Sequence, residues 1–158
     1  MDLLEVMEKR HSCRTFQKEE YGRDIIDQVL NLIKYAREHV PSAGNIKAHQ
    51  TAIVVQAQAK VNICMAALKQ AWVMEAPMLV VFSTDLVPYR RKYLQQGDLY
   101  GAQDLAVFCT YVMLLLEDAG YSTCWIGAFD AGIVAQEIRI AKGMPIVPQA
   151  ILCVGHET

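Results

Sequence analysis

EKRHSCRTF, residues 8–16, is the stretch that most constrains this chain. It places two arginines, Arg10 and Arg14, four positions apart with Ser12 between them. A guanidinium group is permanently charged, and its planar fork of donors matches phosphates and planar carbonyl edges. A serine hydroxyl both donates and accepts hydrogen bonds. The stretch therefore favours a ligand that carries a phosphate and a polar ring, while an exposed basic helix end remains the alternative explanation.

Two further segments accompany this stretch: PSAGNIKAH at residues 41–49 and WIGAFD at residues 125–130. An Arg-x-Ser-x-Arg near the start, a Pro-Ser-x-x-Asn loop and a late Ile-Gly-Ala-Phe turn occur in that order. Together they resemble the nitroreductase family of FMN-dependent flavoproteins, over nearly the whole chain. The resemblance implies a single domain over residues 1–158. It also implies an α+β fold, a three-layer α/β/α sandwich with a central mixed, mainly antiparallel sheet.

The same resemblance implies roles for the residues of the first stretch. Arg10 is expected to hold the FMN phosphate, Arg14 the polar edge of the flavin ring, and Ser12 to contact the cofactor between them. A positive charge near the pyrimidine ring stabilises the charge that builds up when a flavin is reduced. His11 matches a family position that touches the cofactor, often through its backbone.

The loop at residues 41–45 consists of ordinary turn residues, so a plain turn is one interpretation. By the resemblance, the loop comes from the partner subunit and packs on the dimethylbenzene edge and ribityl chain of FMN, through Pro41, Ser42, Ala43 and Asn45. The chain departs from the family directly afterwards, because Lys47-Ala48-His49 stands where Gln-Pro-Trp is usual. This departure puts the shape of the substrate pocket in doubt.

The third segment supplies the expected contact with the flavin ring. Ile126, Gly127 and Ala128 are expected to pass close to the ring, because a glycine lets the backbone approach a planar ligand. A backbone N–H at this turn is expected to meet flavin N5. Trp125 either stacks beside the ring or fills the core.

The function implied is that of a homodimeric, FMN-dependent oxidoreductase. NAD(P)H would reduce the flavin, leave, and be replaced by a small acceptor such as a nitroaromatic or a quinone, in a ping-pong mechanism. No acid or base residue is assigned. A non-catalytic FMN carrier is the main alternative, and action on flavin itself or on a halogenated substrate is another. The chain stops at residues 155–158 without the basic tail of many members, which predicts weaker FMN binding, with His156 as a weak substitute.

Composition excludes several other classes of protein. The 158 residues carry a net charge of −2, so nothing favours nucleic acid or an anionic membrane. The start lacks a signal-peptide pattern, and the most apolar run, residues 105–116, is too short to span a bilayer. Five scattered cysteines without a Cys-x-x-Cys pair are typical of reduced core thiols in a cytoplasmic protein. The histidines show no metal-ligand spacing, and Rossmann, P-loop and nucleophile-elbow motifs are missing.

Hydrophobic periodicity predicts helices and strands in alternation. We expect helices over residues 2–9, from Asp24 to Pro41, and over 60–72, 98–119 and 132–141. We expect strands over residues 51–55, 78–83, 122–126 and 150–154, and an irregular connection over 87–96. The helix at 98–119 is apolar nearly all round, which predicts burial on most sides and, in so small a domain, against another subunit.

Overall fold

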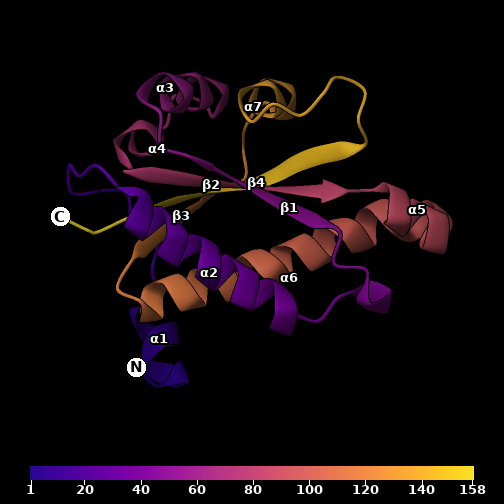
Figure 1. The fold of residues 1–158 in the computed structure, drawn as a ribbon, viewed down its shortest axis with the longest axis horizontal. Coiled ribbons are helices and arrows are strands. Elements are labelled where there is room, and N and C mark those ends of the chain that lie inside the picture. Colours follow the sequence, from indigo (N-terminus) through magenta and orange to yellow (C-terminus); the bar gives the residue numbers. More distant parts are fainter.

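The computed structural model describes residues 1–158 as a four-stranded sheet between two layers of helices (Figure 1). The strands are β1 (His49–Val54), β2 (Met78–Asp85), β3 (Ser122–Ile126) and β4 (Ile146–Gly155). The helices are α1 (Leu3–Lys9), α2 (Arg23–His39), α3 (Ala57–Ala66), α4 (Ala71–Glu75), α5 (Val87–Tyr93), α6 (Gly97–Asp118) and α7 (Ala131–Glu137). Two short 3-10 helices, η1 (Ala43–Asn45) and η2 (Leu94–Gln96), complete the chain.

The sheet has the strand order β1-β2-β4-β3, and every ladder is antiparallel. The only parallel pairing is a single bridge between Ser12 and Thr123, where the chain after α1 runs beside β3. The predicted mixed, mainly antiparallel sheet is therefore confirmed, with one bridge as its parallel component.

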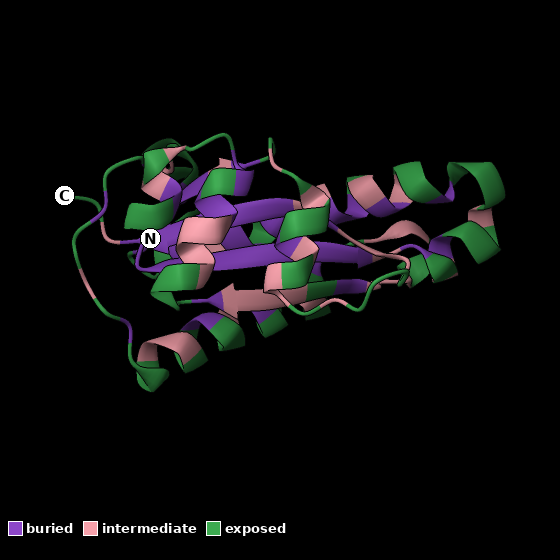
Figure 2. Ribbon diagram, turned by 90° about the horizontal axis from the view of Figure 1, so that it is seen from above, coloured by how far each residue is buried: buried purple, intermediate pink, exposed green.

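Alternation along the strands divides the core into two halves. On β2, Val80 and Phe82 face α2 and α6, whereas Leu79 and Val81 face α3, α4 and α7. Figure 1 shows these two helical layers on opposite sides of the sheet, and Figure 2 shows the buried strands between largely exposed helices. The predicted three-layer α/β/α sandwich is confirmed.

Helix α6 is less completely buried than its composition predicts. It buries one face against the sheet through Leu105, Phe108 and Val112, but Leu99 and Val107 are exposed on the opposite side. The segment Val87–Asp118 is long and apolar enough to cross a membrane by length and composition alone. The packing of α6 against the sheet explains this apolar composition as that of a core helix. The helix ends before Gly120, whose φ of 92° confirms the predicted stop.

The predicted helix over residues 60–72 is wrong in its extent. It consists of two helices, α3 and α4, because Leu68 and Lys69 both adopt φ of 57° and reverse the chain between them. Helical periodicity continues across such a break, since apolar residues on both sides face the same core.

Two other boundaries also differ from the sequence prediction. Gly22, not Asp24, precedes the first turn of α2. The connection over residues 87–96 is helical, because Pro88 lies in the first turn of α5, where its fixed φ favours a helix and its missing N–H costs nothing. The ends of the remaining elements lie within a few residues of the predicted ones, apart from β4, which begins at Ile146.

Candidate functional site

The first and third sequence motifs lie side by side. The backbone N–H of Cys13 donates to the carbonyl of Thr123 at 2.9 Å, and Ser12 forms the parallel bridge to the same residue. Because β3 ends at Ile126, this pairing brings residues 10–14 alongside the strand that leads to Gly127. The fold therefore unites two motifs that are more than a hundred residues apart in the sequence.

A cavity of about 440 Å³ opens between α1, α6 and β3. It is lined by Met7, Arg10, Thr110, Met113, Leu114 and Trp125, and we call it the Arg10 cavity. One cation stands beside thioether, aliphatic and indole walls. The volume of the cavity lies within the range of small-molecule sites, and its lining suits a ligand with an anionic group and a flat apolar part.

The side chains of His11 and Arg14 do not line the Arg10 cavity. The His11 Nε2 atom lies 3.0 Å from a Glu157 carboxylate oxygen, and this hydrogen bond raises the pKa of His11. The Arg14 guanidinium carbon lies 5.4 Å from the ring centroid of Trp72. Both side chains are thus engaged within the chain, although both are exposed.

The turn after β3 presents backbone rather than side chains. Ile126 is 2% exposed and packs in the core beneath α3, α4 and α7, so only its backbone is available to a ligand. Gly127 and Ala128 are exposed. A Cβ atom added at Gly127 would meet only Trp125, at 3.7 Å from Nε1. The outer side of Gly127 is therefore open to a flat molecule, as the predicted ring contact requires.

The loop at residues 41–45 lies apart from the Arg10 cavity. The Ala43 N–H donates to Asp104 Oδ2 at 2.8 Å, whereas the cavity touches α6 from Thr110 onward. The axial step from Asp104 to Thr110 is about 9 Å at the rise of an α-helix. Within one chain, the structure does not bring the second motif to the other two. The Ser42 hydroxyl is buried without a hydrogen-bond partner.

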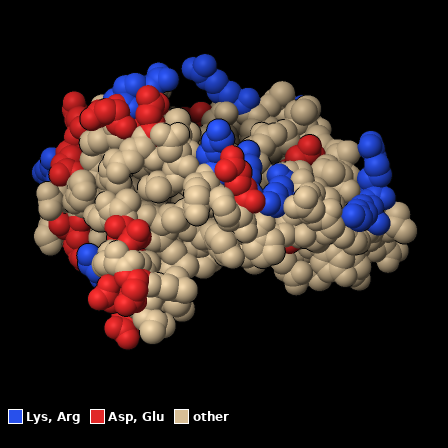
Figure 3. Space-filling view, turned by 60° about the horizontal axis from the view of Figure 1, so that its bottom comes forward, with Lys and Arg blue, Asp and Glu red and all other residues tan.

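Exposed apolar residues occur on both helices that border the Arg10 cavity. Leu4 on α1 is 70% exposed and Leu99 on α6 is 51% exposed. The exposed apolar residues of these two helices are Leu3, Leu4, Met7, Leu99, Val107 and Tyr111. Figure 3 shows charged side chains grouped near the middle and at both sides of the molecule, with uncharged surface between these groups. Exposed apolar surface gathered in one place marks an interaction site in many proteins.

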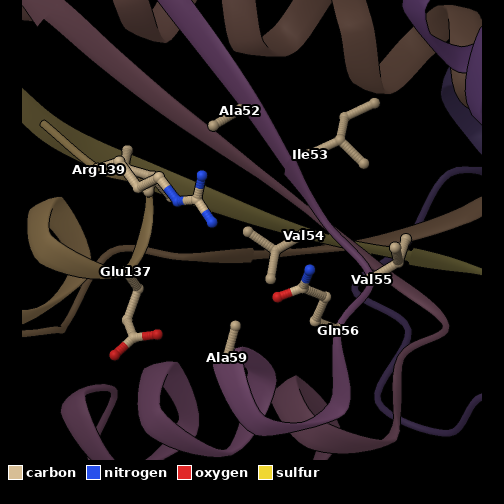
Figure 4. Close-up of a pocket in the computed structure, with 9 residues that line it drawn as sticks. Ala52, Ile53, Val54, Val55, Gln56, Ala59, Glu137 and Arg139 are labelled. Atoms are coloured by element: carbon tan, nitrogen blue, oxygen red, sulfur yellow. The ribbon is translucent and has the colours of Figure 1, made fainter.

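A second cavity of about 350 Å³ lies between β1, α3 and α7, on the other face of the sheet. Figure 4 shows the polar side chains of Gln56, Glu137 and Arg139 around Val54 and Ala59. None of the predicted site residues lines it. No group of three or more His, Cys, Asp or Glu side chains is arranged to hold a metal, and all five cysteines are buried and free.

Comparison with known proteins decides the family. The sequence model described as the nitroreductase family matches residues 47–156, more than half of the chain. The chain belongs to the nitroreductase family. A comparison with curated protein sequences found no match. The predicted family is therefore confirmed by the family model and by the fold.

Solved structures of the nitroreductase fold are similar over essentially the whole chain. A nitroreductase family protein from Clostridium novyi NT is 24% identical, with a TM-score of 0.85 over 100% of this chain and 86% of that one. One from Streptococcus pneumoniae TIGR4 is 19% identical, with a TM-score of 0.85 over 99% and 91%. The NADPH:FMN oxidoreductase from Vibrio harveyi, solved with NAD+, is 19% identical, with a TM-score of 0.81 over 98% and 68%. At these identities the similarity shows the fold.

Several residues that line or adjoin the candidate site escaped the sequence analysis. Met7, Met113 and Leu114 form apolar walls that resemble core residues in the sequence, because their spacing is that of any buried helix face. Asp104 did carry a signal, since it is an acid one residue before the most apolar run of the chain. A carboxylate at the edge of a buried helix face needs partners, and one of its partners, Ala43, is a predicted site residue.

Proposed function

We propose that the protein is a homodimeric, FMN-dependent oxidoreductase that passes electrons from NAD(P)H to a small acceptor such as a quinone or nitroaromatic. The observation that carries this proposal is the Arg10 cavity, where a cation lies beside apolar walls, and where the lining residue Trp125 is within 3.7 Å of a Cβ atom added at the open Gly127. Membership of the nitroreductase family supports it. NAD(P)H and the acceptor would use the same open face in turn, and the whole chain, residues 1–158, would act as one domain.

The proposed contacts follow the structure residue by residue. Arg10 would hold the FMN phosphate, and Ser12 and Arg14, on the adjoining segment, would meet the cofactor after Arg14 leaves Trp72. His11 would contribute its backbone, since its ring is bonded to Glu157. Trp125 would flank the ring, while Ile126, Gly127 and Ala128 would offer backbone to it. When bound, FMN supplies the hydride-accepting chemistry, and these residues bind and orient it.

The partner subunit would complete each site. Loop residues Pro41, Ser42, Ala43 and Asn45 do not reach the Arg10 cavity of their own chain, as expected if they meet the FMN of the other subunit. His156 would not hold the phosphate, because its Nδ1 atom lies 2.8 Å from a Glu19 carboxylate oxygen.

Anaerobic reduction tests the proposed function. FMN-loaded protein is expected to lose its yellow colour on mixing with NADH or NADPH in a stopped-flow instrument, and to regain it when a quinone is added. If it stays yellow with both nucleotides, the reductase proposal fails and the FMN-carrier function replaces it.

Arg10→Ala is expected to weaken FMN binding by about 1.5–3 kcal/mol, the value of a hydrogen bond to a charged group. Riboflavin lacks the phosphate, so its affinity should change little. Fluorescence titration with both ligands measures the difference, and Arg23→Ala, which removes an exposed arginine elsewhere, is the matched control. Equal affinity of the unmodified protein for FMN and riboflavin contradicts the assignment.

The FMN-loaded protein is expected to be a dimer at micromolar concentration. Burial of apolar surface stabilises an interface by roughly 25 cal/mol per Å², and the surface around Leu99 and Val107 is apolar. Val107→Asp should therefore dissociate the dimer and release FMN, whereas Met65→Asp, on the opposite helical layer, should do neither. Light scattering that finds a flavin-loaded monomer contradicts the shared site.

A further inference from the structure

The loop at residues 41–45 has a backbone that needs an external anchor. Gly44, Asn45 and Lys47 have φ of 56°, 57° and 50°, in the left-handed region that is unfavourable for residues other than glycine. Gly44 and Asn45 are also exposed. Two lysines touch this region through exposed hydrogen bonds, since Lys47 donates to the Glu38 carbonyl at 2.9 Å and Lys92 to that of Gly44 at 3.4 Å. Flexible exposed ammonium groups hold a strained loop only weakly.

The stronger anchor is Asp104 on α6. Its Oδ2 atom accepts a hydrogen bond from the Ala43 N–H at 2.8 Å, across 61 residues of sequence. Asp104 is only 9% exposed. A hydrogen bond from a backbone N–H to a carboxylate is charge-assisted, and a low local dielectric strengthens it further. The bond fixes Ala43, the residue directly before the left-handed pair Gly44 and Asn45.

Tyr89 holds the carboxylate from the other side, and His49 lies behind Tyr89. The Tyr89 hydroxyl, fully buried, donates to Asp104 Oδ2 at 2.9 Å. Its oxygen lies 3.1 Å from His49 Nε2, and His49 Nδ1 lies 3.2 Å from Thr84 Oγ1. His49 begins β1, four residues after Asn45. One network therefore fixes the chain on both sides of the exposed turn.

Proton counting shows which bonds of the network are strong. The Thr84 hydroxyl donates its single proton to Gln149 Oε1 at 2.6 Å, and the Tyr89 hydroxyl donates its own to Asp104. Both hydroxyl oxygens can then only accept from His49. A neutral imidazole has one N–H, so it satisfies only one of them. The bonds of Asp104 to Ala43 and Tyr89 need no further proton, and they are the secure part of the network.

We propose that Asp104 is a positioning residue, whose carboxylate holds the 41–45 loop in the shape that meets FMN in the partner subunit's site. The inference rests on the proposed function and deepens it, because it names the residue that shapes the half of the site supplied in trans. Asp104 touches neither cofactor nor substrate and acts through the Ala43 N–H.

The first test compares three variants. Asp104→Ala removes the acceptor and should weaken FMN binding roughly tenfold or more, the effect of losing a charged hydrogen bond. Asp104→Asn keeps a neutral acceptor and should fall between Asp104→Ala and the unmodified protein. Thr84→Val removes a hydroxyl from the same network without touching the loop, and should leave FMN affinity within about twofold, since its loss affects only the far end of the network. Equal FMN affinity in all three variants and the unmodified protein overturns the proposal.

Hydrogen exchange separates this proposal from the proposed function, because it needs no flavin. In the flavin-free protein, Asp104→Ala should speed amide exchange at residues 42–46, whereas Thr84→Val should not. Unchanged exchange in Asp104→Ala overturns the positioning role even if the unmodified protein binds FMN and is reduced normally. Faster exchange in a protein that fails to bind FMN leaves Asp104 as the anchor of the loop and refutes the flavin site instead.

A mixed dimer tests the action in trans. When one subunit carries Arg10→Ala and the other Asp104→Ala, one site has both defects and the other has an intact Arg10 cavity with an intact loop. The mixed dimer should therefore bind one FMN with unmodified affinity, although each homodimer binds weakly. If the loop served its own chain, both sites would carry one defect, and the absence of any tight site would overturn the assignment.

Discussion

Gly127→Val is expected to block FMN binding while leaving the fold intact. A Cβ atom at Gly127 meets only Trp125 Nε1, at the ordinary contact distance of 3.7 Å, and the residue is exposed. The flavin-free protein should therefore unfold at nearly the temperature of the unmodified protein. The branched side chain would, however, fill the space through which the backbone approaches the ring.

Overpacking of a close contact typically costs about 1–3 kcal/mol, which corresponds to a loss of FMN affinity between roughly fivefold and a hundredfold. Titration of the flavin-free protein with FMN measures this loss. Gly127→Ala should give a smaller effect in the same direction, and circular dichroism checks the fold of both variants. If Gly127→Val binds FMN as well as the unmodified protein does, the turn after β3 does not contact the ring.

Stability is expected to fall by about 3 kcal/mol between pH 6.5 and pH 4 because of His49. Burial lowers the pKa of His49 to about 4 from its ordinary value of 6.5, with Asp104 raising it and Arg37 lowering it to lesser extents. Between these two values the unfolded chain binds a proton that the folded chain does not. The contribution of neutral His49 to the free energy of unfolding is therefore fully present above pH 6.5 and is lost as the pH falls through 4.

Urea unfolding at several pH values measures this effect. His49→Gln keeps a polar atom near the Nε2 position but does not titrate, so its free energy of unfolding should fall less steeply with acid. His39→Gln, an exposed histidine at the end of α2, should follow the unmodified protein. Parallel curves for His49→Gln and the unmodified protein exclude a buried neutral imidazole.

The exposed apolar face links these predictions to assembly. Leu99 and Val107 lie on the side of α6 that faces away from the sheet, and the Arg10 cavity opens beside the same helix. A second subunit on this face would cover the apolar surface and close the cavity at the same time. The proposed dimer and the proposed site therefore depend on each other, and Val107→Asp tests both.

The sequence by itself determined most of the helices and strands, and the resemblance of its motifs to a family supplied their arrangement in layers. The β-branched and aromatic content of residues 78–83 predicted β2, and Gly120 predicted the end of α6. These features depend on neighbours in the chain, because side chains alternate along a strand and repeat along a helix. The break between α3 and α4 escaped prediction, since left-handed Leu68 and Lys69 belong to residue types that normally continue a helix.

The tertiary structure alone decided which residues form the candidate site. The pairing of Ser12 with Thr123 brought the first and third motifs together, and the bond from Ala43 to Asp104 tied the second motif to α6 instead. No local pattern specifies such contacts, because they depend on how the sheet and helices pack over the whole chain. The sequence therefore supplied the chemical groups, and the packing of distant segments decided which of them meet.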